Sequence, residues 1–438
     1  METALSFPFD ERGIEKIYLD SREDGRGGLF VPIIGAHKDG HDFIEMAVER
    51  GAAAVLSSRD VTELKKKYPE VRFWQVPDTR AALQEIGRYE RERFRGKVIG
   101  VTGSSGKTTM RSMLALALSS ERRVFQTAGN ANSQLGVPIT LFQLARSGAE
   151  IAALELGMSE PGEMTRIASI ARVDLALITN IGTAHIENLK TKENILFEKL
   201  HILDGAADGA ALYLNGEDPL LASLTEERIH DLGISLGKRV ELHFYRAKEE
   251  IPLSAAGHHM QQNAAAALAV SLDLGLQREG VLRALRGFSG LKGRGEKLLS
   301  RSGIGILDDS YNASPDALKA SLLVLSKEEG RRKIALLSDM LELGERSEEL
   351  HEDCGAFLSS LPIDRVLLYG EKSLGILRGI RREEKRRGDG RQIPVSHFSN
   401  AEELYRELLR EAAPGDLVLF KGSHSMGLSR LVERFREE

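Results

Sequence analysis

The chain has 438 residues, of which 29% are charged and 42% hydrophobic, a composition typical of globular proteins with two to four domains. Its formal net charge of −5 argues against non-specific binding to nucleic acid. No apolar run approaches the length of a membrane span, and the first residues lack the pattern of a secretory signal. A single cysteine, Cys354, excludes an internal disulfide, and we expect it to be buried filler. We therefore expect a cytoplasmic protein, monomeric by default, that binds neither nucleic acid nor membranes.

Residues 1–95 predict a small α/β unit. A helix is expected from Thr79 to about residue 94, and its charged end, residues 88–95, is typical of a solvated linker into the next unit. Four short apolar runs between turn-forming residues are the expected strands, at residues 17–19, 29–34, 53–56 and 73–76.

A glycine-rich turn lies between an expected strand and an expected helix, with the sequence GVTGSSGKTT at residues 100–109. Glycines let successive N–H groups converge on one anion, and the helix N-terminus adds partial positive charge. Lys107 can reach terminal phosphates, and the Thr108 hydroxyl can ligate Mg²⁺. The usual loop of this kind has four residues between its glycines, whereas Gly103 lies three before Gly106. The alternative is an ordinary strand-to-helix turn. The residues expected to bind the nucleotide here are Gly103, Ser104, Ser105, Gly106, Lys107, Thr108 and Thr109.

Residues 96–295 alternate strand and helix, which predicts a mostly parallel sheet. Ligands gather at the carboxyl ends of strands in such sheets, so Glu155 and Asn180 should lie beside the glycine-rich turn. Glu155, with Thr108, is the first candidate for holding a metal; the alternative is a helix-capping or solvent-facing carboxylate. The expected strands are residues 151–154, 175–180 and 211–215.

Residues 296–438 repeat this pattern and predict a second doubly wound unit without a phosphate loop of its own. Pro315 is expected to open a helix, a favoured place for proline. The basic stretch from Arg378 to Arg391 could bind an anion, but we favour a solvated helix and loop. The expected strands are residues 304–307, 334–337, 366–369 and 417–420.

Several of these stretches together resemble the Mur ligase family, which joins amino acids or peptides to the peptidoglycan precursor. The phosphate loop TGSSGKTT, with its unusual glycine spacing, is the form that this family uses. Three stretches resemble the branch that adds D-alanyl-D-alanine to UDP-N-acetylmuramoyl-tripeptide: GNANSQLGVP at residues 129–138, DDSYNA at residues 308–313 and DMLELG at residues 339–344. The resemblance covers nearly the whole chain.

This resemblance implies an α/β, ATP-dependent, ADP-forming ligase of three domains. A UDP-substrate domain would span residues 1–95 and a central ATP-binding domain residues 96–295. A Rossmann-like domain for the incoming dipeptide would span residues 296–438. A carboxylate is a poor electrophile, so ATP would convert it to an acyl phosphate that an amine then attacks. Both steps concentrate negative charge, so the site needs cations more than a nucleophilic side chain.

The resemblance also implies catalytic roles for Lys107, His185 and Lys199, and two Mg²⁺ sites. Thr108 and Glu155 would serve the first site and His185 the second; a histidine alone is more often structural. Lys199 aligns with a lysine that the family carbamylates with CO₂, giving an anion that helps to position the second Mg²⁺. The alternative for Lys199 is a helix-surface lysine.

Residues 257–263 resemble the family's adenine-side motif, in which Asn263 hydrogen-bonds the base, because an amide can both donate and accept. The alternative is a helix N-terminal cap with polar filler. Arg294 resembles a hinge arginine that contacts ATP phosphate. Asp309, Tyr311 and Asn312 would face the cleft near the nucleotide. The residues implied to bind the other substrates are Ser21, Arg22, Asp39, Gly40, His41, Asn130 and Asn132.

Four positions depart from the family pattern. Ser133 and Ser159 stand where asparagine is usual, Met260 where a polar residue is expected, and His424 where arginine is preferred. These departures concern acceptor and UDP-substrate recognition more than ATP use. Two alternatives stay open: another amide ligase of this fold, adding one amino acid or glutamate to folate, and a catalytically silent nucleotide-binding relative. The sequence does not identify the third residue of the tripeptide.

Overall fold

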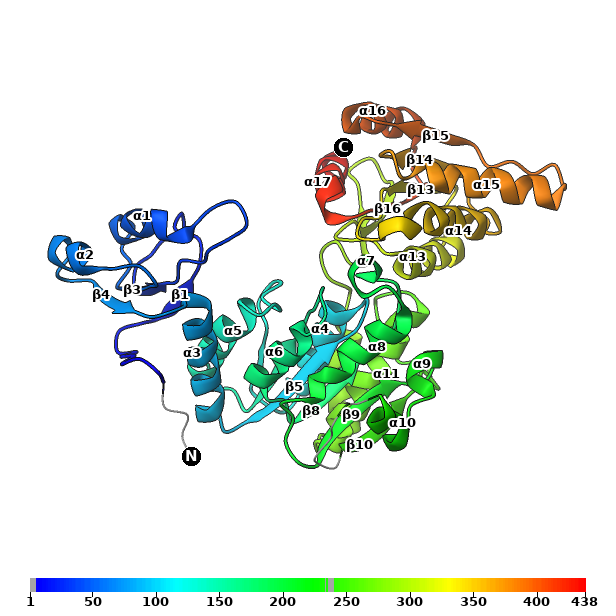
Figure 1. The fold of residues 1–438 in the computed structure, drawn as a ribbon. Helices are drawn as coiled ribbons and strands as arrows, with labels where there is room; N and C mark the ends of the chain where they lie inside the picture. The colour runs from blue at the N-terminus through cyan, green and yellow to red at the C-terminus, as the bar shows by residue number, and fades with distance from the viewer. Residues whose placement is uncertain (1–4, 233, 235–239) are drawn as a thin grey trace.

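A computed structural model describes residues 5–232, 234 and 240–438 and arranges them in three α/β units, each with its own sheet. The N-terminal and C-terminal units lie on either side of the central unit, apart from each other (Figure 1). The α/β class that the sequence predicts is therefore confirmed. Within the described ranges, no helix combines the length and apolar character needed to cross a membrane.

The N-terminal unit has a four-stranded parallel sheet, and all four strands lie where the sequence predicts them. One face of the sheet packs on two short helices. The other packs on α3 and on Phe142 of the central helix α5, so the two units share part of one core. The elements are β1 (Lys16–Tyr18), β2 (Gly28–Phe30), α1 (Ile44–Glu49), β3 (Ala54–Ser57), α2 (Thr62–Lys67), β4 (Arg72–Gln75), α3 (Thr79–Arg93) and, in the central unit, α5 (Gly136–Ala145).

The central unit has a six-stranded parallel sheet in the order β10-β9-β8-β5-β7-β6, with apolar cores on both faces. Its strands are β5 (Lys97–Thr102), β6 (Val124–Gln126), β7 (Ile151–Glu155), β8 (Leu175–Ile178), β9 (Ala210–Asn215) and β10 (Val240–Tyr245). Its other helices are α4 (Lys107–Leu118), α6 (Glu163–Ala171), α7 (Ile186–Leu189), α8 (Lys192–Leu200), α9 (Pro219–Ala222), α10 (Glu226–Asp231), α11 (His258–Asp273) and α12 (Arg278–Arg286).

The C-terminal unit has a mixed sheet in the order β11-β12-β16-β13-β14-β15, in which only β11 runs antiparallel to its neighbour. Cys354 is buried on α14, as predicted, and burial raises the pKa of its thiol to about 12. The strands are β11 (Glu296–Leu299), β12 (Gly305–Asp309), β13 (Lys333–Ser338), β14 (Arg365–Tyr369), β15 (Val395–Phe398) and β16 (Leu417–Lys421). The helices are α13 (Pro315–Lys327), α14 (Ser347–Ser359), α15 (Leu374–Arg387), α16 (Ala401–Glu411) and α17 (Leu428–Glu437).

The charged end of α3 is not a solvated linker, so that prediction is wrong. Glu90 is fully buried and pairs at 3.0 Å with Arg146, the residue that follows α5. The Arg91 guanidinium donates to the carbonyl oxygens of Ala171 and Arg172 and pairs with Asp174 at 3.0 Å. These partners lie far away in the sequence, so a local run of charges gave no sign that the helix end packs on the central unit.

The basic stretch of α15 behaves as the solvated helix that the sequence favours. Arg378 pairs with Glu348 at 2.7 Å, and Arg382 pairs with Glu352 at 2.6 Å, both on the neighbouring helix α14. The positive charge is thus balanced within the unit, and exposed ion pairs of this kind contribute little to stability.

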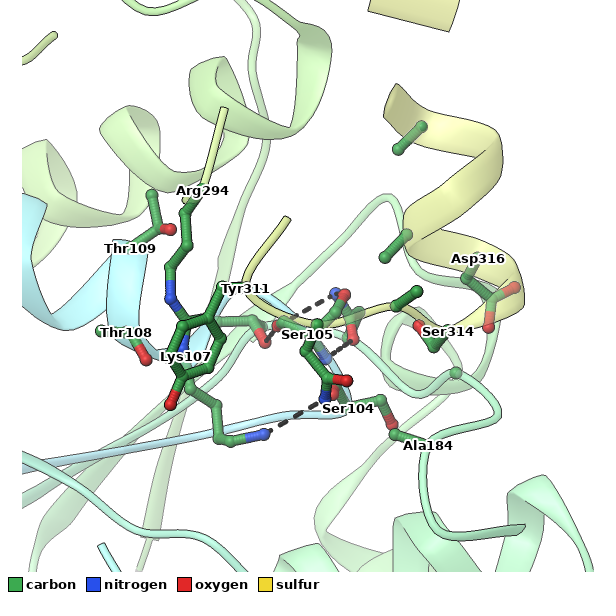
Figure 2. Close-up of a pocket in the computed structure, with 18 of the residues that line it drawn as sticks. Ser104, Ser105, Lys107, Thr108, Thr109, Ala184, Arg294, Tyr311, Ser314 and Asp316 are labelled. Carbon is green, nitrogen blue, oxygen red and sulfur yellow. Dashed lines mark hydrogen bonds between the residues drawn. The ribbon is translucent and has the colours of Figure 1, made fainter. Parts of the chain in front are cut away.

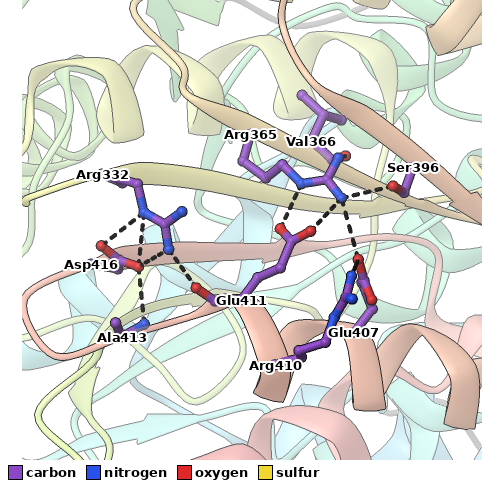
Figure 3. A network of polar contacts seen from close by, with 9 residues as sticks. All are labelled: Arg332, Arg365, Val366, Ser396, Glu407, Arg410, Glu411, Ala413 and Asp416. Carbon is purple, nitrogen blue, oxygen red and sulfur yellow. Dashed lines mark hydrogen bonds and ion pairs between the residues drawn. The ribbon is translucent and has the colours of Figure 1, made fainter.

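A second, buried network of charges joins the amino ends of β13, β14 and β16 (Figure 3). Asp416 has no exposed side-chain surface and accepts from Arg331, Arg332 and the backbone N–H of Ala413. Arg365, at the start of β14, donates to both carboxylate oxygens of Glu411. These contacts lie at the edge of the sheet opposite to its carboxyl ends, so their role is to hold the unit together.

Candidate functional site

The glycine-rich turn connects the middle strand β5 to α4 and curves as a phosphate loop. Gly103 and Gly106 have φ angles of 149° and 76°, a region that side-chain-bearing residues rarely adopt. A Cβ on Gly103 would also overlap with the hydroxyl of Thr179 after β8. Asn180 fixes the loop from this neighbouring strand, because its carbonyl accepts from Ser104 N at 3.0 Å and its side chain from Ser105 N at 3.0 Å.

Lys107 is the first residue of α4, and its ammonium lies over the loop, donating to the carbonyl oxygen of Gly103 at 2.8 Å. Burial lowers the pKa of Lys107; the charge of Glu155 opposes this shift, and that of Arg294 adds to it. The helix N-terminus and the loop N–H groups favour an anion at the same point. The arrangement therefore suits the phosphates of a nucleotide.

Glu155 ends β7 and carries an unsatisfied acceptor. Its Oε1 accepts from Asn132 Nδ2 at 2.7 Å, whereas Oε2 is buried without a hydrogen-bond partner. The closest cation to Oε2 is Arg111 Nη1, at 3.9 Å. A buried carboxylate oxygen without a donor is costly unless a cation meets it, so this position fits a metal ligand. The solvent-facing alternative for Glu155 is wrong.

Arg111 is a site residue that sequence reasoning missed. It lies one turn after Lys107 on α4, is nearly fully buried, and donates to the carbonyl oxygens of Thr127 and Gly129. It thereby ties the phosphate-loop helix to the segment that carries Asn130 and Asn132. The spacing of four from Lys107 places both side chains on one face of a helix, and this was the available signal.

A cavity of about 860 Å³ opens above the phosphate loop, between the central and C-terminal units (Figure 2). It brings together most of the predicted nucleotide and metal residues with two predicted substrate residues. Within the described part of the chain, no three His, Cys, Asp or Glu side chains cluster as metal ligands. The predicted site residues that line the cavity are Ser104, Ser105, Gly106, Lys107, Thr108, Thr109, Asn130, Asn132, Glu155, His185, Asn263, Arg294, Asp309, Tyr311 and Asn312.

The C-terminal side of the cavity is held by contacts of the Tyr311 ring and by one buried ion pair. The Arg294 guanidinium lies 3.9 Å from the centre of the Tyr311 ring, and the centre of the His424 ring lies 5.2 Å from that same centre, with the two rings tilted by 42°. Lys421, almost fully buried, pairs with Asp309 at 2.6 Å and donates to Asn312 O at 3.0 Å. Cation–π contact orients the Arg294 side chain toward the phosphate loop.

His185 connects the two units. It has a left-handed φ of 61°, and its Nδ1 lies 2.9 Å from the carboxylate of Glu342, which has a left-handed φ of 60°. The contact with His185 lowers the pKa of Glu342. Two side-chain-bearing residues in this sparsely populated region, paired across one interface, indicate a functional constraint.

Lys199 does not line this cavity. The alternative interpretation of Lys199 as a helix-surface lysine is also wrong, because its side chain is buried. It lies in the last turn of α8 with 1% of its surface exposed. Burial, reinforced by the positive charge of Lys107, lowers its pKa well below the ordinary value. An amine held neutral in this way is nucleophilic.

Three positions that depart from the family pattern, Ser133, Ser159 and Met260, line the cavity along with Asn263. Asn263 is buried in the second turn of α11, and Gly257 is the N-cap of this helix, so residues 257–263 do form a helix N-terminus, as the alternative held. Met260 is buried in the same helix. Ser133 Oγ accepts from Gly136 N at the start of α5, and Ser159 N donates to Glu163.

The predicted substrate residues of the N-terminal unit lie outside the cavity. The His41 ring is buried; Nδ1 contacts Asp39 at 2.6 Å, and Nε2 accepts from Ser58 N at 3.0 Å. Both ring nitrogens are therefore used within the unit. Arg22 is exposed and pairs with Asp20. The remaining two, Ser21 and Gly40, lie in the same unit: the Ser21 hydroxyl contacts Met46 Sδ at 3.5 Å, and Gly40 begins a short 3₁₀ turn.

A phosphate loop at the carboxyl edge of a parallel sheet, facing an unsatisfied carboxylate, defines a nucleoside-triphosphate-binding protein. Comparison with known proteins narrows this class. Three family models match successive parts of the chain: "Mur ligase family, catalytic domain" residues 13–91, "Mur ligase middle domain" residues 101–271, and "Mur ligase, glutamate ligase domain" residues 293–424.

The chain is 35% identical to the UDP-N-acetylmuramoyl-tripeptide–D-alanyl-D-alanine ligase of Bacillus subtilis, over 97% of this chain and 94% of that protein. It superposes on a crystal structure of MurF from Acinetobacter baumannii with a TM-score of 0.82, at 28% identity and with 97% and 94% of the two chains covered. MurF ligase from Thermotoga maritima in complex with ADP gives a TM-score of 0.79, at 28% identity over 98% of each chain. The chain belongs to the Mur ligase family.

Proposed function

We infer that this protein is an ATP-dependent, ADP-forming ligase that adds D-alanyl-D-alanine to UDP-N-acetylmuramoyl-tripeptide in the synthesis of the peptidoglycan precursor. The observation that carries this inference is the 35% identity to a ligase of that name, which extends over 97% of the chain. The cavity supports it, because phosphate-binding and carboxylate groups meet there between two units.

We assign the binding of each of the three substrates to a different unit. We propose that residues 1–95 bind the UDP-sugar peptide, residues 96–295 bind ATP, and residues 296–438 bring the dipeptide. The Ser21, Arg22 and Asp39–His41 region lies outside the cavity, and we assign it to the UDP-sugar end of a substrate long enough to reach the phosphate loop.

The reaction transfers the terminal phosphoryl group of ATP to a carboxylate oxygen of the tripeptide, giving an acyl phosphate and ADP. The amine of the dipeptide then attacks the carbonyl carbon and loses a proton, and phosphate leaves. Lys107 and the loop N–H groups hold the phosphates, and Arg294 adds a second positive charge from the hinge. Closure of the C-terminal unit over the loop keeps water from the acyl phosphate.

The residues at the carboxyl edge of the sheet fit Mg²⁺, which takes hard oxygen ligands and commonly uses few carboxylates together with substrate phosphates. The buried, unpaired Oε2 of Glu155 and the Thr108 hydroxyl would hold one ion, and His185 would serve a second. When bound, Mg²⁺ neutralises charge that gathers on the phosphate oxygens. Asn132 holds Glu155 in place through its other oxygen.

The test is phosphate release from ATP and Mg²⁺ with the UDP-linked tripeptide, in the presence or absence of D-alanyl-D-alanine. We expect release to require both co-substrates and the product to have the mass of the UDP-pentapeptide. Tripeptides carrying lysine or diaminopimelate at the third position identify the natural substrate. Release driven by glutamate or a single amino acid instead would move the protein to another branch of the family, and no turnover with any amine would favour a silent relative.

Lys199 is proposed to carry a carbamate. Its neutral Nζ attacks the carbon of CO₂ and gives up one proton to water, leaving a carbamate anion that would help to hold the second Mg²⁺. Burial to 1% exposure and the lowered pKa support this step. We expect ¹³C-labelled bicarbonate to give a carbamate signal in the NMR spectrum that disappears in Lys199→Met. The signal should persist in Lys385→Met, an exposed lysine of α15; its absence from the unmodified protein would contradict the proposal.

A further inference from the structure

Besides the His185–Glu342 pair, the C-terminal unit contacts the central unit through Asp316, whose Oδ1 lies 3.9 Å from Lys192 Nζ. Asp316 lies in the first turn of α13, and its Oδ2 accepts from both Thr183 N, at 3.0 Å, and Thr183 Oγ1, at 3.2 Å. Figure 2 shows it at the start of α13, near the loop that carries Ala184. The positive end of the α13 dipole favours the negative charge of this carboxylate.

The fit around Asp316 leaves no room for a side chain on the facing loop. A Cβ on Gly182 would lie 2.6 Å from Asp316 Oδ2 and 3.4 Å from Ser104 Cβ. Gly182 is not among the glycines of the described chain with positive φ, so backbone freedom does not explain glycine here. Glycine is needed at this position because the C-terminal unit approaches the loop closely.

The same loop is tied to the phosphate loop. Asn180 O accepts from Ser104 N at 3.0 Å, and Ile181 N donates to Asp218 at 2.8 Å. Residues 180–183 are therefore fixed on the central unit on one side and held by Asp316 on the other. Asp316 therefore helps, together with the His185–Glu342 pair, to fix where the C-terminal unit stands relative to the phosphate loop.

We propose that Asp316 is a positioning residue that seats the C-terminal unit over the phosphate loop, so that the amine carried by this unit reaches the acyl phosphate. The proposal rests on the proposed function for its kinetic consequence, but the docking contact itself does not depend on it. Nothing in the sequence pattern identifies this role, because Thr183 lies 133 positions away.

The kinetic test replaces Asp316 with alanine. Losing a charge-assisted hydrogen bond with two donors should lower kcat/KM for D-alanyl-D-alanine about tenfold or more. ATP binding in the absence of the dipeptide, and the unfolding temperature, should stay unchanged. Thr183→Ser keeps both donors and should behave as the unmodified protein. Asp353→Ala, an exposed acid on α14, is the matched control and should also leave kcat/KM unchanged.

A second variant tests the geometry. Gly182→Ala should lower kcat/KM about tenfold by displacing the Asp316 carboxylate from Thr183, and should have little further effect in an Asp316→Ala background, where the added methyl group finds space. The Thr183 amide should exchange its hydrogen faster in Asp316→Ala than in the unmodified protein, because Asp316 Oδ2 accepts from this N–H. Additive losses in the double variant, or an unchanged exchange rate, would overturn the proposal. If the unmodified enzyme does not use the dipeptide, the proposed function fails, and the exchange comparison still decides the docking role.

Discussion

Replacing Lys107 with methionine is expected to lower kcat for phosphate release by about 10³-fold, because losing one preorganised group that stabilises transition-state charge typically costs this much. Methionine keeps the length of the side chain without its charge. The ammonium lies over the phosphate loop, donating to Gly103 O at 2.8 Å, where it can meet the phosphates of the nucleotide. The measurement is steady-state phosphate release with saturating co-substrates.

Lys97→Met is the matched control for this variant. Lys97 begins β5, the strand that leads to the phosphate loop, but lies at its opposite end with an exposed side chain. We expect its kcat to match that of the unmodified protein. A Lys107→Met protein that kept more than a tenth of the original kcat would show that the ammonium is not needed for phosphoryl transfer.

Replacing Asp416 with asparagine is expected to lower the free energy of unfolding by about 2–3 kcal/mol, since the buried carboxylate loses charge-assisted hydrogen bonds from two guanidinium groups. Arg331 and Arg332 are partly exposed, so water solvates their charges in the variant. Denaturant unfolding of both proteins measures it. Glu402→Gln breaks an exposed pair with Arg434 in the same unit, so its loss should stay below about 1 kcal/mol. Equal losses in the two variants would contradict this account of the network.

The pH dependence of stability follows from the same residue. Burial alone would raise the pKa of Asp416, but hydrogen bonds from Arg332, Arg331 and the Ala413 N–H outweigh it and lower this pKa from its ordinary value of 3.8 to about 2. A carboxylate with a lowered pKa in the folded protein stabilises it above the unfolded pKa and loses this effect as pH falls through the folded one. About 2 kcal/mol should therefore be lost between pH 4 and pH 2. In Asp416→Asn this part of the pH dependence should be missing.

Local patterns in the sequence identified the elements of the site that are themselves local. The phosphate loop, Lys107 and the carboxyl end of β7 follow from spacing within about ten residues, and each lies where it was expected. The edge strands were missed, namely β6 and β10 of the central sheet and β11 and β15 of the C-terminal sheet, because they are short or partly exposed and carry little apolar periodicity. Their places come from pairing with β7, β9, β12 and β14, respectively.

Residues whose role depends on distant partners could not be found from the sequence. Arg91 looks like part of a solvated charged run, yet its acceptors are carbonyl oxygens about 80 positions away. Asp316 looks like an ordinary acidic residue at a helix start until Thr183 is seen beside it. The burial of Lys199 likewise depends on how α8 packs in the folded chain.

The shared core of α3 and α5 sets a limit on recombination between relatives. Phe142 of α5 belongs to the same apolar cluster as Leu29 and Leu56 of the N-terminal sheet, and Leu135 and Ile139 pack against it. A chimera that exchanged only residues 1–95 would place the N-terminal sheet of a relative against α5 of this chain, whose side chains pack on a different sheet. The piece that can be exchanged as a whole includes residues 135–142, although they lie beyond the phosphate loop in the chain. A segment that is exchanged unbroken from the N-terminal sheet to residue 142 would therefore carry the phosphate loop with it.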